Sequence, residues 1–252
     1  MERVLPKTID YTDVLPLAVE SKSRRRTFFP TNGQTFTDNT NNIVRIDISA
    51  DALLDTQHSY LRFTGTFAGN TVGIDFAGGH SFIRRLRVEQ SGTILEDIQS
   101  YNKLMGGIVL PCQVGSDYLK ERSITEGVNQ NSRAGTVALF QQPQAAQVTG
   151  AGAGVGDALG LRTGAALTNI PLMLMSAPLT IEIELAPHVQ AVSAAGAGTY
   201  SWSNVRYIAN LVEVGQDVAQ QLRMVQEMSG GVLTLAGQTY RHFSGQTSGG
   251  AE

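Results

Sequence analysis

The feature that most constrains the fold is a set of short segments in which apolar and polar residues alternate. Residues 179–185 read LTIEIEL, residues 43–48 read IVRIDI, and residues 59–69 repeat the pattern. Successive side chains of a strand point to opposite faces, so each segment places its apolar residues on one face. Such alternation is typical of antiparallel sheets with one face on a core and one face in water. The sequence therefore predicts a mainly β protein.

The chain length sets the scale of that core. A chain of 252 residues can form one large β-sandwich or two small domains, and either could bury a sizeable core. We expect the inward residues of the alternating segments to share one core. They are Val44, Ile46, Ile48, Leu61, Phe63, Ile181, Ile183 and Leu185.

Charge and cysteine content exclude several classes of protein. The 19 basic and 22 acidic residues nearly balance, with a formal net charge of -3, which argues against a surface that coats nucleic acid. The single cysteine, Cys112, cannot form an intramolecular disulfide, and we expect it to be a buried small apolar residue. The N-terminus lacks the apolar segment of a secretion signal, and no apolar stretch is long enough to cross a membrane. We expect a soluble protein made inside the cell.

Residues 1–26 have mixed polarity and no sustained period, which predicts an extended N-terminal arm. The arm ends in a basic run formed by Lys22, Arg24, Arg25 and Arg26. These residues could contact a nucleic acid, another anionic surface or a neighbouring subunit, or they could belong to a solvated arm. After the arm, residues 27–29 and 43–48 are expected to form the first strand pair, with a turn-rich span between them.

Residues 81–98 predict a hairpin. Ser91-Gly92 lies at its tip, where a tight turn needs residues that accept positive φ. Three arginines, Arg84, Arg85 and Arg87, occur on its first strand. They could bind phosphate, but a polar outer face paired with acidic neighbours or with a partner subunit is the more ordinary interpretation.

The middle of the chain loses the strand period. Residues 101–110 and 117–124 are typical of short helices or connecting loops, and residues 134–168 predict a Gly/Ala-rich loop insertion. Glycines within 150–156 do not have the G-x-G-x-x-G spacing of a dinucleotide site.

The strand pattern resumes after that loop. Residues 200–214 predict a long central strand, and residues 216–228 predict a helix that ends at Gly230-Gly231. Residues 232–235 and 239–243 are expected to form a closing hairpin or strand, and 246–252 a flexible tail. If the chain contains a second roll of strands, it would start at about residue 232.

Catalytic signatures are lacking. The four histidines are far apart in sequence, and the S-x-x-K match at Ser100–Lys103 lacks its partner motifs. The pair Glu182 and Glu184 falls on the outward face of an alternating strand, where solvated carboxylates are ordinary. We therefore expect no catalytic residue, cofactor site or metal site, and no enzyme.

Two passages carry a resemblance to a known family. In the first, residues 61–64 lead to the hairpin residues 82–88 and 95–98; in the second, residues 177–186 precede the strand 200–207 and the helix lead-in 211–214. With about eight strands, helical excursions and long loops, this order resembles viral jelly-roll coat proteins. The similarity is to the hexon-like double jelly-roll major capsid proteins of tailless icosahedral DNA viruses, in which a strand containing a motif like Ser203–Tyr207 runs into a short helix.

The resemblance implies an antiparallel jelly-roll β-sandwich over residues 27–245, with short helical insertions and long loops. It implies a structural capsid protein that self-assembles into capsomers, expected to be trimers, with itself and other capsid proteins as partners and no cofactor or small-molecule substrate. The arm could make weak contact with the genome or an internal membrane. The protein would be made in the host cytoplasm and located in the virion. The open alternatives are a minor or vertex (penton-type) capsid protein and a non-viral ligand-binding β-sandwich.

Overall fold

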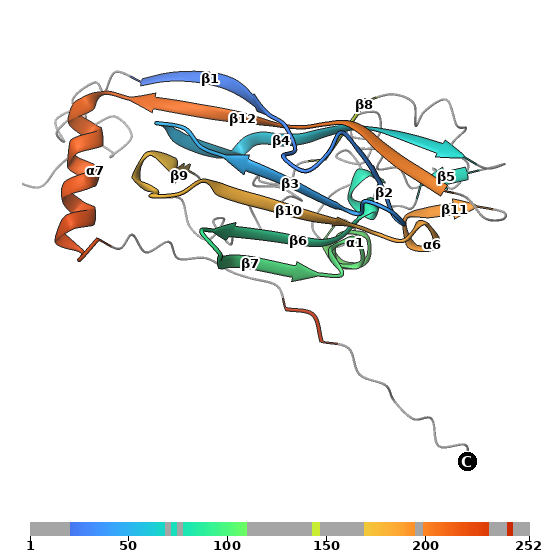
Figure 1. The fold of residues 1–252 in the computed structure, drawn as a ribbon. Helices are drawn as coiled ribbons and strands as arrows, with labels where there is room; N and C mark the ends of the chain where they lie inside the picture. The colour runs from blue at the N-terminus through green and yellow to red at the C-terminus, as the bar shows by residue number, and fades with distance from the viewer. Residues whose placement is uncertain are drawn as a thin grey trace, which may run out of the picture.

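The computed structural model describes residues 21–68, 72–74, 78–109, 143–146, 169–194, 199–231 and 241–243. Two antiparallel sheets face one another as the layers of a sandwich (Figure 1). The first sheet has the order β1-β12-β4-β8, and its strands are β1 Ser21–Phe28, β12 Thr199–Val214, β4 Leu53–Ala68 and β8 Pro143–Ala146. Short strands β2 Thr35–Thr37 and β9 Asn169–Pro171 pair with β12 and β4.

The second sheet has the order β3-β10-β6-β7. Its strands are β3 Ile43–Ile48, β10 Leu179–Leu185, β6 Ile83–Gln90 and β7 Thr93–Gln99. When the eight principal strands of both sheets are counted in chain order, the first sheet has the order 1-8-3-6 and the second 2-7-4-5. This order, in which the chain repeatedly changes sheet, is that of a jelly roll. The expected jelly-roll sandwich is therefore confirmed.

The core lies between the two sheets. Strand β10 alternates without exception between buried and half-buried residues, as its sequence predicts. All eight residues expected in the core are at most 1% exposed. Trp202 is also fully buried, and its ring stacks on Phe63 with centroids 3.8 Å apart. Burial of an aromatic or branched apolar side chain contributes about 1.5–3 kcal/mol, so this interior accounts for much of the folding free energy.

The predicted hairpin is present as β6 and β7. Ser91 and Gly92 connect the strands with φ of 49° and 81°, respectively. Two successive positive φ values are those of a type I′ turn, whose twist matches that of the flanking strands. The long strand expected at 200–214 is β12, and it is central because it pairs with β1 on one side and β4 on the other.

Within the described ranges the helical segments are few and short, except at the end of the sandwich. They are the 3-10 turns η1 Gly78–Phe82 and η4 Leu172–Leu174, α1 Tyr101–Leu104, the π-helical turn η2 Met105–Val109 and α6 His188–Ala191. The predicted helix is α7, Gln216–Met228, and Gly230 and Gly231 follow it with positive φ. Strands β5 Val72–Ile74 and β11 Val192–Ala194 form a separate two-stranded sheet.

Three expectations need correction. Residues 21–26 are not part of an extended arm, because Ser21–Phe28 is strand β1 and pairs along its whole length with β12. Residues 27–28 and 43–48 do not pair with each other but lie in opposite sheets. Within the expected loop 134–168, Pro143–Ala146 forms β8 against β4. In each case the ladder partner is far away in sequence, where local pattern carries no information.

Other expectations fall partly or wholly outside the described residues. These include residues 1–20, 117–124, Cys112, most of 134–168, 232–240 and the tail 246–252. Residues 241–243 are described and form no strand, so the expected strand 239–243 does not extend into them. Among the described helices, none has the length and apolar character needed to cross a membrane.

Candidate assembly surfaces

The basic run expected to contact a neighbour or an interior lies on β1. All four of its residues are exposed, and the strand pleat divides them between two faces. Lys22, Arg24 and Arg26 share the face of Phe28, which is buried, while Arg25 points to the opposite face. The four charges therefore do not form one patch, a separation that the linear sequence does not show.

Two of the four basic residues have partners within the protein. Arg24 Nη2 lies 2.6 Å from Glu213 Oε1 at the end of β12. Arg26 Nη1 donates a 3.4 Å hydrogen bond to the carbonyl of Ser49, and its guanidinium lies 5.0 Å from the ring centre of Phe28. Lys22 and Arg25 form no ion pair within the described part of the chain. The expectation of a neighbour or interior contact stays a prediction, and these two residues are the ones available for it.

The three arginines of the hairpin lie on the outer face of the second sheet, and each meets an acid. Arg85 makes a two-bond fork with Asp97, with Nε to Oδ1 at 2.6 Å and Nη2 to Oδ2 at 2.5 Å. Arg84 pairs with Glu184 at 3.2 Å, and Arg87 pairs with Glu182 at 3.4 Å. The hydrogen bond from Arg85 holds the pKa of Asp97 below its ordinary value. The arginines thus form a polar face neutralised by acids, and a phosphate site is not needed to account for them.

Glu182 links three strands of that face. Besides Arg87 on β6, it binds Arg45 on β3, with Nη2 to Oε2 at 2.5 Å. This contact raises the pKa of Arg45, chiefly through the hydrogen bond to Glu182. The pair Glu182 and Glu184 therefore serves as the acidic half of a cross-strand ion network, as expected for an outward face.

At the opposite end of the sandwich from α7, Asp38 ties the β2–β3 connection to α6. Its carboxylate Oδ2 accepts 2.9 Å and 2.7 Å hydrogen bonds from the backbone N–H and Nδ1 of His188, and only 2% of its side chain is exposed. Tyr200 donates to the carbonyl of Ala186 nearby, and its burial together with the charge of Asp38 raises its pKa well above the ordinary value. Sequence pattern did not reveal this cluster, because Asp38 and His188 are far apart in the chain.

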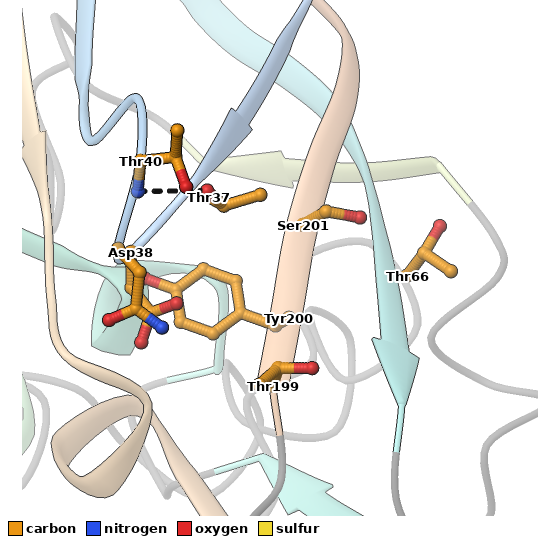
Figure 2. A pocket seen from close by; sticks show the side chains of 8 residues that line it. Thr37, Asp38, Thr40, Thr66, Thr199, Tyr200 and Ser201 are labelled. Atoms are coloured by element: carbon orange, nitrogen blue, oxygen red, sulfur yellow. Dashed lines mark hydrogen bonds between the residues drawn. The ribbon is translucent and has the colours of Figure 1, made fainter.

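The cluster borders an open hollow of about 300 Å³ (Figure 2). Its walls are rich in hydroxyl groups, and within them the N–H of Thr40 donates to the hydroxyl of Thr37 at 3.2 Å. The lining residues are Thr37, Asp38, Asn39, Thr40, Thr66, Thr199, Tyr200 and Ser201. Within the described residues, the pair of Asp38 and His188 makes no hydrogen bond to a serine or threonine hydroxyl of this lining, as a catalytic triad would require. Over the described ranges, no cluster of His, Cys, Asp and Glu could hold a metal ion.

Helix α7 stands across the other end of the sandwich (Figure 1). It has no buried residue, and its apolar side chains Met224, Val225 and Met228 are 59%, 52% and 88% exposed. One weak tie to the sandwich is a 3.4 Å hydrogen bond from Gln226 to the carbonyl of Leu174. An amphipathic helix normally buries its apolar stripe, so α7 presents a surface suited to a further contact.

A second hollow, of about 450 Å³, lies at the edge of the sandwich beside Arg26. Its walls come from the end of β3 and from the segment that joins η4 to β10. The lining residues are Arg26, Ile48, Ser49, Ala50, Asp51, Leu172, Met173, Met175, Ser176, Ala177 and Pro178. Among the described residues that line it, only Arg26 and Asp51 have ionisable side chains, so this hollow offers no arrangement for acid–base chemistry.

No protein-family model matches the chain, and no curated protein matches it either. Among solved structures, the chain is similar to PBCV-1 VP54, whose crystal structure was fitted into a cryo-EM reconstruction of the virophage Sputnik. The two are 14% identical with a TM-score of 0.51, and the match covers 86% of this chain and 47% of VP54. The mavirus major capsid protein is 10% identical with a TM-score of 0.41, over 85% of this chain and 52% of that one. The Faustovirus major capsid protein is 9% identical with a TM-score of 0.42, and the match covers 79% of this chain and 56% of the Faustovirus protein. This chain therefore spans about half the length of each, and the likeness to VP54 shows that it shares that structure's jelly-roll fold.

Proposed function

We propose that the protein is a structural capsid protein that self-assembles into capsomers of an icosahedral shell and acts without catalysis. The observation that carries the proposal is the jelly roll itself, which matches VP54 over 86% of this chain. The VP54 structure was fitted into a cryo-EM reconstruction of the virophage Sputnik. Since a fold alone does not specify function, the surfaces of this chain must support the same conclusion.

Helix α7 provides the first support. Its apolar side chains Met224, Val225 and Met228 form an exposed stripe, and the helix has no buried residue. Exposing this apolar surface to water costs free energy in an isolated subunit, and covering it with a neighbour removes that cost. Shell subunits associate through repeated contacts of this kind, in which symmetry brings each copy to the next. We propose that α7 takes part in the contact between copies in the capsomer, with a trimer as the stoichiometry that the family resemblance implies.

The basic run provides a second contact. Lys22 and Arg25 lie exposed on the edge strand β1 without acidic partners in the described part of the chain. We propose that they meet acidic groups of a neighbouring subunit or of the shell interior, including the genome or an internal membrane. Such exposed charges are strongly screened by salt.

The strand count favours a second, related role. The eight principal strands account for one jelly roll, and the chain covers 47% of VP54. One roll in the described part of the chain is compatible with a minor or vertex capsid protein as well as with a major one. In either role we propose that the protein resides in the virion and that other capsid proteins are partners.

Assembly can be tested with the purified chain by multi-angle light scattering and negative-stain microscopy. We expect a defined oligomer, and the double variant Met224→Gln, Met228→Gln should reduce it to monomer with an unchanged melting temperature. Ile94→Gln is the matched control, because Ile94 is 52% exposed on a different element, β7, and its replacement should leave the oligomer intact. In the same assay, Lys22→Gln with Arg25→Gln should weaken assembly and lower its sensitivity to salt.

A wild-type chain that stays monomeric at high concentration in low and high salt would overturn the proposal. Deletion of residues 1–26 would be a poor test, because it removes most of β1 and so disrupts the first sheet. Substitution leaves the strand in place and isolates the effect of charge.

A further inference from the structure

The outer face of the first sheet carries two ordered rows of hydroxyl groups where β2, β12 and β4 lie side by side. Ser201 is directly opposite both Thr37 and Thr66, and Ser203 is directly opposite both Thr35 and Thr64. The intervening residues Phe36 and Trp202 are fully buried, so the hydroxyl residues occupy the outward positions. This part of the face is uncharged and able both to donate and to accept hydrogen bonds.

One end of these rows opens into the hollow of about 300 Å³ described above. Figure 2 shows Thr199 and Ser201 on β12 beside Thr66 on the adjacent strand, along the wall of the hollow. The rows and the hollow therefore form one continuous surface, lined by short polar side chains.

The other end of the rows reaches two arginines. Arg62 on β4 and Arg206 on β12 are cross-strand partners on the same outward face, and both are half-buried. Like charges directly opposite one another destabilise a sheet. Neither has an acidic partner among the described residues, and the Nε atom of Arg206 is buried without a hydrogen-bond acceptor.

The second sheet shows that this arrangement is not general to the protein. There Arg45, Arg84, Arg85 and Arg87 each lie within 4.0 Å of a carboxylate. A bulge also sets the position of Arg206: the register shifts between Ser203 and Arg206, and Asn204 within it has a φ of 51°. Bulges frequently redirect a side chain next to a functional site.

We propose that this face binds an acidic oligosaccharide. The Arg62 and Arg206 guanidinium groups take its carboxylate or sulfate, for which the planar fork of arginine is well matched. The hydroxyl rows bind neutral sugar hydroxyls, and the hollow receives the sugar at the far end. Arg62 and Thr66 are four residues apart on β4, or about 13 Å, which suits an oligosaccharide rather than a single sugar.

Tyr60 adds an aromatic side chain to this surface. It is half-buried, two residues from Arg62 on the same side of β4 and directly opposite Ile208. A partly exposed ring beside a charged group can pack against the apolar face of a sugar. A nucleic acid fits less well, because the chain carries a net charge of -3 and the rows beside the arginines carry no charge. This proposal does not depend on the capsid role.

Isothermal titration calorimetry of the full chain tests the proposal with four probes: sialyllactose, a sulfated heparin tetrasaccharide, neutral lactose and inorganic sulfate. We expect saturable binding of at least one acidic oligosaccharide, at least tenfold tighter than lactose or sulfate. Arg206→Gln and Arg62→Gln should each weaken it at least tenfold. Thr66→Val with Ser201→Ala should weaken oligosaccharide binding but not sulfate binding. Arg84→Gln, on the other sheet, is the matched control and should bind as the wild type does.

Three results would overturn the proposal. The first is that neither acidic oligosaccharide binds, and the second is that sulfate binds as tightly as the oligosaccharide. The third is that the wild-type chain binds no saccharide while Arg62→Gln and Arg206→Gln lose self-association. The third would show that the face is a contact between copies. Circular dichroism identifies unfolded variants, and Arg62→Gln stands in if Arg206→Gln does not fold. If saccharide binding fails while oligomers form, the capsid proposal still stands. If oligomerisation fails while saccharide binds, the saccharide proposal stands and the capsid proposal does not.

Discussion

Ile183 offers the sharpest test of the sandwich. It is completely buried at the centre of β10, directly opposite Val44 on β3 and Leu86 on β6. Its side chain therefore packs where three strands meet the opposing sheet.

The size of the effect follows from the deleted atoms. Ile183→Ala removes three carbons, each worth about 0.8 kcal/mol of transfer free energy, or about 2.4 kcal/mol in total. The central position on β10 leaves little room for collapse, so a cavity adds to the loss, and we expect about 3–4 kcal/mol. Ile183→Val should cost about 1 kcal/mol. Ile183→Asp buries an unpaired charge and should prevent soluble folding.

Urea denaturation followed by tryptophan fluorescence measures the effect, because Trp202 is the single tryptophan and lies fully buried in the same core. The midpoint should fall while the slope stays constant. Ile94→Ala is the control, since Ile94 is 52% exposed and its loss should change stability by no more than about 0.5 kcal/mol. If Ile183→Ala costs as little as Ile94→Ala, or if Ile183→Asp folds normally, β10 is not at the centre of the core.

Three further predictions concern the β6–β7 hairpin. Arg85 lowers the pKa of Asp97, so the pair stabilises the fold above the ordinary pKa of about 4, and this contribution is lost as the pH falls through the lower folded value. Asp97→Asn should therefore lower the melting temperature at pH 7 and make its decline in acid less steep. An unchanged acid profile would contradict this. Gly92→Ala should destabilise by about 1 kcal/mol, because φ is 81° and a Cβ would meet no atom within 4 Å, which leaves backbone strain as the cause. Ser91→Asn, which suits a positive φ, should be neutral or stabilising in the same thermal melt, and a loss equal to that of Gly92→Ala would argue against the turn geometry.

The sequence by itself determined the local features of the fold. Alternation in 43–48 and 179–185 assigned each side chain to a face, and the structure buries the expected residues. Ser91-Gly92 marked the tip of a hairpin because few residues accept two successive positive φ values. The helix 216–228 was also predicted from its local period and its following glycines. These features depend on neighbours a few residues apart.

The tertiary structure decided which strands are neighbours. It placed the basic run on a strand against β12, although Arg24 and its cross-strand partner Leu211 are far apart in the chain. It made Pro143–Ala146 a strand, although that segment has little intrinsic β propensity, and it joined Asp38 to His188. It also set Arg62 opposite Arg206 while it gave each hairpin arginine an acid. The face of a side chain follows from a two-residue period, but its cross-strand partner follows from the register between distant segments, which only the packed sandwich defines.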